Sequence, residues 1–86
     1  MDKHVIMGVH ITDRVKHAVD VQKVLTTYGR QIRTRLGLHE TGPDATEPNG
    51  VLVLELTGRD ETHRELGESL SSIDGVEVQT MVFDHP

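Results

Sequence analysis

The chain has 86 residues, no cysteine, a formal net charge of −5 and one tyrosine and one phenylalanine as its only large rings. Its length fits a single domain over residues 1–86, and the lack of cysteine excludes disulfides, thiolate chemistry and cysteine-based metal sites. The negative charge argues against direct binding of nucleic acid, which selects for lysine and arginine.

No apolar run approaches the roughly 18 residues that a membrane span needs. The first residues lack the apolar core and small-residue cleavage site of a signal peptide. We therefore expect a cytoplasmic protein with no membrane partner and no direct nucleic-acid partner.

The first two predicted elements are a strand over residues 4–11 and a helix over residues 14–28. Apolar side chains occupy every second position of the strand, which indicates one buried face. The helix carries an apolar stripe opposite its charged residues. Thr12 or Asp13 is expected to cap this helix by accepting a backbone hydrogen bond, and Gly29 to end it in the left-handed conformation.

A second strand is predicted over residues 31–38 and a third over residues 51–57. In the second strand, Ile32, Thr34, Leu36 and Leu38 are expected on one face, and Gln31, Arg33, Arg35 and Gly37 on the other. The segment between the strands, residues 39–50, is rich in glycine, proline and acidic residues. It is too long for a tight hairpin, so we expect a mobile loop.

A second helix is predicted over residues 60–74, with Leu66, Leu70 and Ile73 as a narrow apolar stripe. Gly75 then turns the chain into a fourth strand over residues 76–83. The order β-α-β-β-α-β predicts an α+β sandwich of the ferredoxin-like type. Right-handed crossovers give a four-stranded antiparallel sheet in spatial order 4-1-3-2, with both helices on one face.

The predicted core is aliphatic and consists of Val15, Leu25, Leu52, Leu54, Leu66, Leu70, Ile73 and Val78. The sheet face opposite the helices is apolar too, through Ile6, Val51, Val53, Met81 and Phe83. An apolar centre with a polar rim is typical of a protein–protein interface, and a small domain often gains stability by oligomerising. We therefore expect a homodimer or a dimer of dimers formed through this face.

The candidate ligand-binding residues are Arg33, Arg35, His10 and His39. Arg33 and Arg35 are predicted to share a strand face, from which they could bind a carboxylate or a phosphate. The alternative is that they pair with Glu55 across the strands or form a salt bridge at an interface.

The six histidines do not have the spacing of a metal-ligand set. His4 and His10 are about 20 Å apart along one strand face, by the rise of a strand. His17 and His63 are predicted on exposed helix faces. A divalent-metal site is therefore the least favoured interpretation, and His10 and His39 from different subunits would be its best ligands.

Three segments carry a resemblance to a known family: residues 5–9 (VIMGV) with Asp13 and Arg14, residues 29–38 (GRQIRTRLGL) and residues 73–78 (IDGVEV). Through them the chain resembles a small family usually labelled iron-only hydrogenase system regulators. The resemblance implies a relation to ACT-type regulatory domains and to the ligand-binding half of the nickel-responsive repressor. Both assemble through sheets or edges and bind small effectors near subunit interfaces. Nickel binding is not implied, because only His39 stands where that repressor half has its ligands.

Paired carboxylates, a Ser/His/Asp set and phosphate-binding glycines are all unconvincing in this sequence. The leading hypothesis is a non-enzymatic regulatory or sensor domain without a cofactor, which homo-oligomerises and binds a small effector or a partner protein. The alternatives are a structural protein–protein interaction module without a small ligand and, less favoured, a divalent-metal-binding protein.

Overall fold

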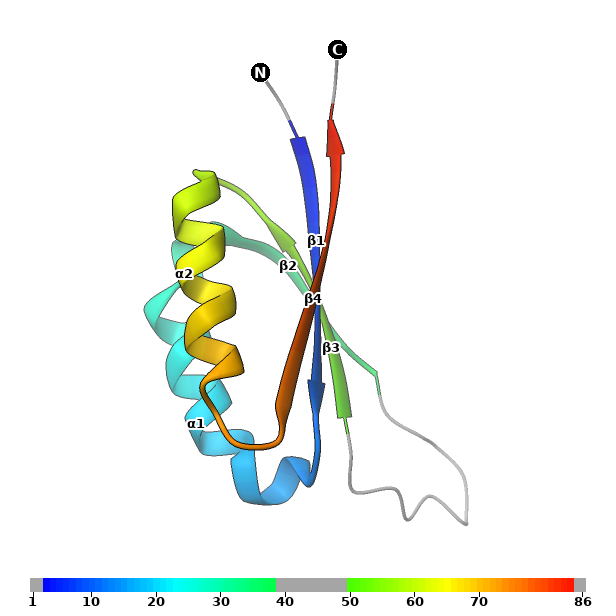
Figure 1. The fold of residues 1–86 in the computed structure, drawn as a ribbon, viewed down its shortest axis with the longest axis vertical. Helices are drawn as coiled ribbons and strands as arrows, with labels where there is room; N and C mark the ends of the chain where they lie inside the picture. The colour runs from blue at the N-terminus through cyan, green and yellow to red at the C-terminus, as the bar shows by residue number, and fades with distance from the viewer. Residues whose placement is uncertain (1–2, 39–49, 85–86) are drawn as a thin grey trace.

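The computed structural model describes residues 3–38 and 50–84, which form a two-layer α+β sandwich (Figure 1). Its elements in chain order are β1 (Lys3–Ile11), α1 (Arg14–Thr27), the 3₁₀ turn η1 (Gly29–Gln31), β2 (Ile32–Leu38), β3 (Gly50–Leu56), α2 (Asp60–Ser71) and β4 (Val76–Asp84). The strands form an antiparallel sheet in the order β2-β3-β1-β4. Both helices lie on one face of it. The predicted ferredoxin-like architecture is confirmed.

The central strand β1 alternates between the core and the open face of the sheet. Val5, Met7, Val9 and Ile11 are buried on the helix side, as the period-two pattern predicts. They pack in one cluster with Val21 and Leu25 of α1, Leu54 and Leu56 of β3, and Leu66 and Leu70 of α2. The core is therefore a single aliphatic layer between the sheet and the two helices.

Four of the predicted core residues are buried, namely Leu25, Leu54, Leu66 and Leu70. The prediction is wrong for Leu52, Ile73 and Val78, which are only partly buried and pack against the margin of the core. Val78 lies on the edge strand β4, and Ile73 lies beyond the last turn of α2. The side chain of Val15 lies outside the described part of the structure.

Gly75 lies in the connection from α2 to β4 and contacts the connection from β1 to α1 at the same end of the sandwich. Its φ is 79°, and a Cβ atom there would lie 3.2 Å from Nε2 of His17 and 3.4 Å from the carbonyl oxygen of Thr12. The backbone N–H of Thr12 donates a 2.8 Å hydrogen bond to the Gly75 carbonyl. Both the left-handed backbone and the close approach require glycine at this position.

Two predictions about the ends of α1 are wrong. Asp13 adopts a left-handed backbone with φ of 51°, and no side-chain hydrogen bond caps the helix. Its carbonyl oxygen accepts from the N–H groups of Lys16 and His17 instead. Gly29 does not have a positive φ and begins η1, so the chain leaves α1 through a tightened turn.

An extra residue in β2 reverses its side-chain alternation. Ile32 pairs with Leu56, but the next register pair joins Thr34 to Glu55, so Arg33 is inserted as a bulge. The predicted faces of β2 are therefore wrong beyond Arg33. Arg35 and Gly37 lie on the helix side opposite Leu54 and Leu52, while Leu36 and Leu38 face away from the helices.

Leu54 is completely buried in β3, so Leu54→Ala should lower the free energy of unfolding by about 2–5 kcal/mol, as removal of core methyl groups does. Denaturant unfolding followed by circular dichroism measures this loss. The control is Val19→Ala on α1, which is 65% exposed and should change stability by less than about 0.5 kcal/mol. Equal effects of the two substitutions would contradict the packing described above.

Candidate functional site

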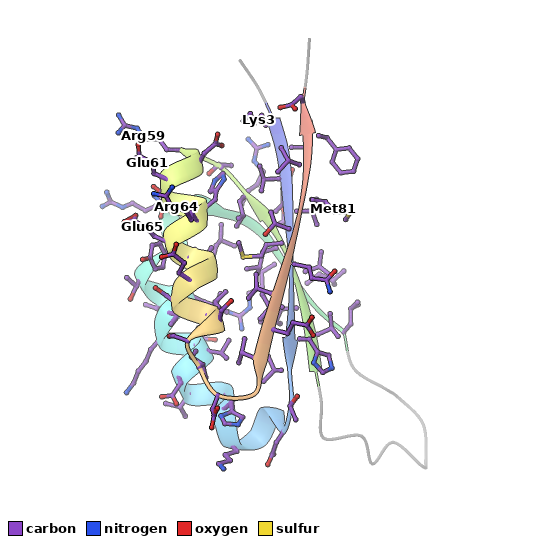
Figure 2. All side chains as sticks on the ribbon, viewed as in Figure 1. Lys3, Arg59, Glu61, Arg64, Glu65 and Met81 are labelled. Carbon is purple, nitrogen blue, oxygen red and sulfur yellow. The ribbon has the colours of Figure 1, made fainter. Side chains whose placement is uncertain are left out.

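The open face of the sheet, opposite the two helices, is covered by no helix or strand among residues 3–38 and 50–84. Register places the predicted interface residues together on it: Ile6, Val51, Val53, Met81 and Phe83. Figure 2 shows Met81 projecting from the side of the sheet opposite the helices. The bulge adds Leu36 and Leu38, so the open face is more apolar than the sequence indicated. Leu36, Met81 and Phe83 are each more than half exposed.

The charged and histidine side chains of the open face lie toward its two ends, while the amide of Gln79 lies beside Gly8 in its middle. His10 and Glu77 are register partners near one end. Toward the other end, Glu55 accepts a 3.0 Å hydrogen bond from the Thr34 hydroxyl and lies 3.8 Å from Nδ1 of His4. The register-paired positions of this face carry neither lysine nor arginine. An apolar centre with polar ends is the arrangement found at protein–protein interfaces.

A second candidate site is an open groove of about 830 Å³ at the end of the sheet where β1 begins. Its walls come from β1, β2, the end of β3 and the first turn of α2. The polar lining combines cations, carboxylates and histidines: Lys3, His4, Arg33, Glu55, Arg59, Asp60, Glu61 and His63. Figure 2 shows Lys3 at this end of β1 and Arg59 at the start of α2.

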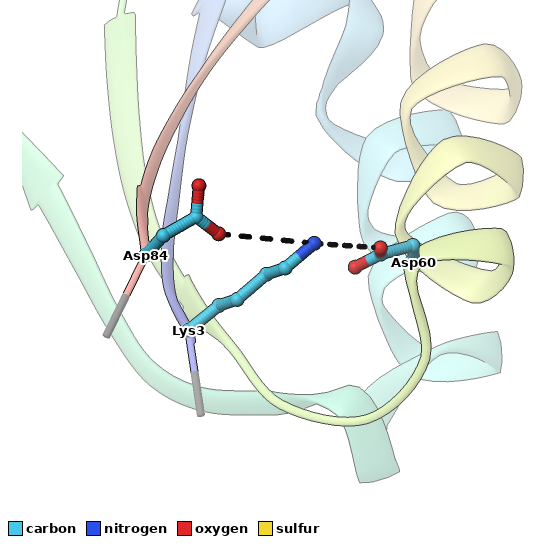
Figure 3. A network of polar contacts seen from close by, with 3 residues as sticks. All are labelled: Lys3, Asp60 and Asp84. Atoms are coloured by element: carbon cyan, nitrogen blue, oxygen red, sulfur yellow. Dashed lines mark hydrogen bonds and ion pairs between the residues drawn. The ribbon is translucent and has the colours of Figure 1, made fainter. Parts of the chain in front are cut away.

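Lys3 links three elements beside the groove. Its Nζ donates a 2.9 Å hydrogen bond to Oδ2 of Asp60 on α2 and lies 4.0 Å from Oδ1 of Asp84 on β4 (Figure 3). The hydrogen bond from Lys3 and its positive charge hold the pKa of Asp60 below the ordinary value. The same bond and the carboxylate charge raise the pKa of Lys3.

His63 is buried, so its predicted position on an exposed helix face is wrong. Its Nε2 lies 2.7 Å from the carbonyl oxygen of Thr57. A carbonyl only accepts, so Nε2 carries the proton and donates. The burial of His63 could have been predicted from its spacing in the sequence. His63, Leu66 and Leu70 lie at i, i+3 and i+7, so His63 extends the apolar stripe of α2 by one turn.

The structure does not bring together the three candidate ligand residues that it describes, Arg33, Arg35 and His10. Arg33 lines the groove, whereas His10 lies toward the other end of the open face. Arg35 lies on the helix side and donates a 2.9 Å hydrogen bond to Oε1 of Gln22 on α1, so the predicted shared face of the two arginines is wrong. The bulge at Arg33 is the cause. His39 lies outside the described residues.

The alternative role of the arginines, pairing with Glu55, is not what the described contacts show, because Glu55 contacts Thr34 and His4. Within residues 3–38 and 50–84, no three histidine, aspartate or glutamate side chains gather closely enough to hold a metal ion. No helix among the same residues has the length and apolar character to cross a membrane.

Comparison with known proteins shows a likeness of structure. No protein-family model matches the sequence, and no curated protein matches it. The uncharacterized protein TM1266 from Thermotoga maritima is 25% identical over 96% of this chain and 100% of that one, with a TM-score of 0.82. The chain thus shares its fold with TM1266 over nearly its full length.

Two further solved structures show the fold alone. CPII, a nitrogen regulatory PII-like protein from Thiomonas intermedia K12 bound to ADP, AMP and bicarbonate, is 12% identical over 99% of this chain and 97% of that one, with a TM-score of 0.59. A formyltetrahydrofolate deformylase from Pseudomonas putida KT2440 is 12% identical, with a TM-score of 0.55. That match covers 93% of this chain but 28% of the deformylase.

The Lys3–Asp60 pair should make stability depend on pH at both extremes. Because the folded-state pKa of Asp60 is lowered, its contribution is complete above about pH 4 and is lost as pH falls through the folded pKa. The raised pKa of Lys3 keeps its contribution complete below about pH 10.5 and loses it as pH rises further. Lys3→Met should therefore lower the melting temperature at neutral pH, by an amount that shrinks in acid and in high salt.

Melting curves from about pH 2 to pH 8 test this range, which spans the ordinary pKa of an aspartate. Lys16→Met, at an exposed position of α1, is the matched control and should show no comparable pH dependence. A deficit in Lys3→Met that is the same at every pH would show that its cause is lost packing rather than charge.

Proposed function

We propose that this chain is a non-enzymatic regulatory or sensor domain that self-associates through its open sheet face. The observation that carries the proposal is that face itself. Its large apolar side chains, among them Leu36, Leu38, Met81 and Phe83, are roughly half exposed in the single chain. A contiguous apolar surface of this kind on a small domain marks an interaction site.

The small size of the core is a second argument for self-association. Among the described residues the core is an aliphatic layer of ten buried side chains, which leaves a domain of this size with a narrow stability margin. Covering the open face with a second copy would add a second apolar layer without lengthening the chain. Twofold symmetry makes every favourable contact occur twice.

Regulation by a small ligand is supported by the likeness to CPII, a PII-like nitrogen regulatory protein of this fold whose structure holds ADP, AMP and bicarbonate. The resemblance to iron-only hydrogenase system regulators adds the proposal that the regulated process is a hydrogenase system. That part rests on the resemblance of residues 5–9, 29–38 and 73–78 alone.

We place the effector site in the groove beside Lys3. Arg33 is exposed there and has no ion-pair partner among the described residues, whereas Lys3 is engaged by Asp60 and Asp84. An available guanidinium favours a ligand with a carboxylate or phosphate group. The carboxylates of the groove, Glu55, Asp60 and Glu61, favour a small ligand that also carries a cationic or hydrogen-bond-donating group.

Val53→Glu should shift the protein toward monomer. Val53 lies in the middle of the open face, so the substitution brings like charges together between two copies and removes apolar contact. Sedimentation velocity across a dilution series measures the effect. Val19→Glu, the same change on the exposed face of α1, should leave association unchanged. A wild-type protein that sediments as a monomer at about 100 μM would contradict self-association, because an interface of this kind should hold at micromolar concentration.

Ligand binding is tested separately by thermal shift with ADP, AMP, amino acids and dicarboxylates, since a ligand specific for the folded state raises the melting temperature. Arg33→Gln should abolish the shift that a ligand produces. Arg35→Gln should preserve it, because Arg35 faces α1 rather than the groove. Equal loss in both variants would contradict this site, and no shift with any compound would favour the structural interaction module without a ligand.

A further inference from the structure

Gly8 occupies the middle of the open face. Along β1 it stands between Ile6 and His10, and across the sheet it is the register partner of Val53 on one side and Gln79 on the other. All four neighbours carry side chains on the open face, whereas Gly8 carries none. The register therefore indicates a hollow in the side-chain layer above Gly8, bordered by Ile6 and Val53.

No contact among residues 3–38 and 50–84 requires glycine at this position. Within them, a Cβ atom built on Gly8 would meet the backbone oxygen of Gln79 at 3.8 Å, which is an ordinary van der Waals contact. Its φ is not positive, in contrast with Gly58 and Gly75. Glycine in the interior of a strand weakens that strand and often marks a bulge, a tight bend or a place where a ligand or another backbone approaches closely. The register of β1 is regular at Gly8, so neither a bulge nor a bend accounts for it.

The size and charge of the face fit a second copy of this chain. The strands are seven or nine residues long. Counting seven residues in each, four strands about 4.8 Å apart with a rise of about 3.4 Å per residue present roughly 450 Å² in projection. Accessible area exceeds projected area, so two such faces approach the roughly 1,200 Å² of a specific interface. The chain carries a net charge of −5, and the open face carries Glu55 and Glu77. Gly8 and its register partners Val53 and Gln79 are uncharged, so a contact between two copies that is centred on Gly8 has no charged side chain at its centre.

We propose that the Gly8 hollow is a socket that receives an apolar side chain from the open face of a second copy. The contact is isologous, so each copy contributes one socket and one inserted side chain on either side of the twofold axis. This inference rests on the proposed self-association. It adds that Gly8 is the position that determines how the two open faces pack against each other. Gly8 thus determines the specificity of the interface rather than the stability of the subunit.

The test is a pair of substitutions that fill the hollow, Gly8→Ala and Gly8→Val. Sedimentation velocity over a dilution series should show a dimer dissociation constant raised several-fold by alanine and by roughly tenfold or more by valine. Gly37→Ala in β2 is the matched control: its Cβ would lie on the helix side, 3.6 Å from Cδ2 of Leu52, and association should stay at the wild-type level.

Stability is measured at a concentration where every variant is monomeric, so that loss of association does not enter the comparison. The Gly8 variants should then unfold at or above the wild-type temperature, because both residues suit a strand better than glycine. If Gly8→Val fails to fold, Gly8→Ala decides, since its single added carbon has room.

The outcomes separate this inference from the function on which it rests. Gly8 variants that associate as tightly as wild type, while Val53→Glu dissociates, overturn the socket and leave self-association standing. A wild type that is monomeric at every concentration, including one that binds a different protein through this face, overturns both. Weaker association in the Gly8 variants with unchanged monomer stability and an unaffected Gly37→Ala control supports the socket.

Discussion

Both layers of the domain depend on the pairing of β1 with β3 along one side and with β4 along the other. The inner residues Val5, Met7 and Val9 are almost completely removed from water and form the floor of the core. The outer residues Ile6 and Gly8 occupy the centre of the open face. A slip of one residue in this register would exchange the two sets. The same nine-residue strand thus positions the core and the surface that we propose as the interface.

Strict alternation made β1 predictable, and the helical spacing of Leu66 and Leu70 made α2 predictable, because each pattern reports directly on burial. The faces of β2 were not predictable in the same way. Its residues Ile32, Thr34, Leu36 and Leu38 alternate as if all faced one side, yet a bulge separates the first from the others. No glycine or proline marks the bulge, so its position is set by pairing with β3 rather than by local sequence.

The groove beside Lys3 could not be predicted from the sequence for a related reason. Lys3, Arg33, Glu55 and Asp60 come from four separate elements, and only the sheet order brings them to one end of the sandwich. Arg33 was a candidate because it was predicted to share a strand face with Arg35, from which the two could bind a carboxylate or a phosphate, and the bulge removes that shared face. Lys3 and Arg59 resemble ordinary solvated charges in the sequence, and nothing local indicates that Lys3 contacts both Asp60 and Asp84. Ion pairs between residues far apart in the sequence leave no periodic pattern from which they could be predicted.

The pairing of β1 with β4 also has a kinetic consequence. Even the register partners nearest in sequence, Ile11 and Val76, are 65 residues apart (76 − 11), so this half of the sheet closes nearly the whole chain into a loop. Such non-local pairing incurs its entropic cost before its contacts form, and it slows folding relative to helical domains of similar size. Until β4 arrives, one edge of β1 keeps its backbone groups unpaired beside an apolar strand. The domain is therefore most prone to misassociate while it folds, through the strand that later organises its native form.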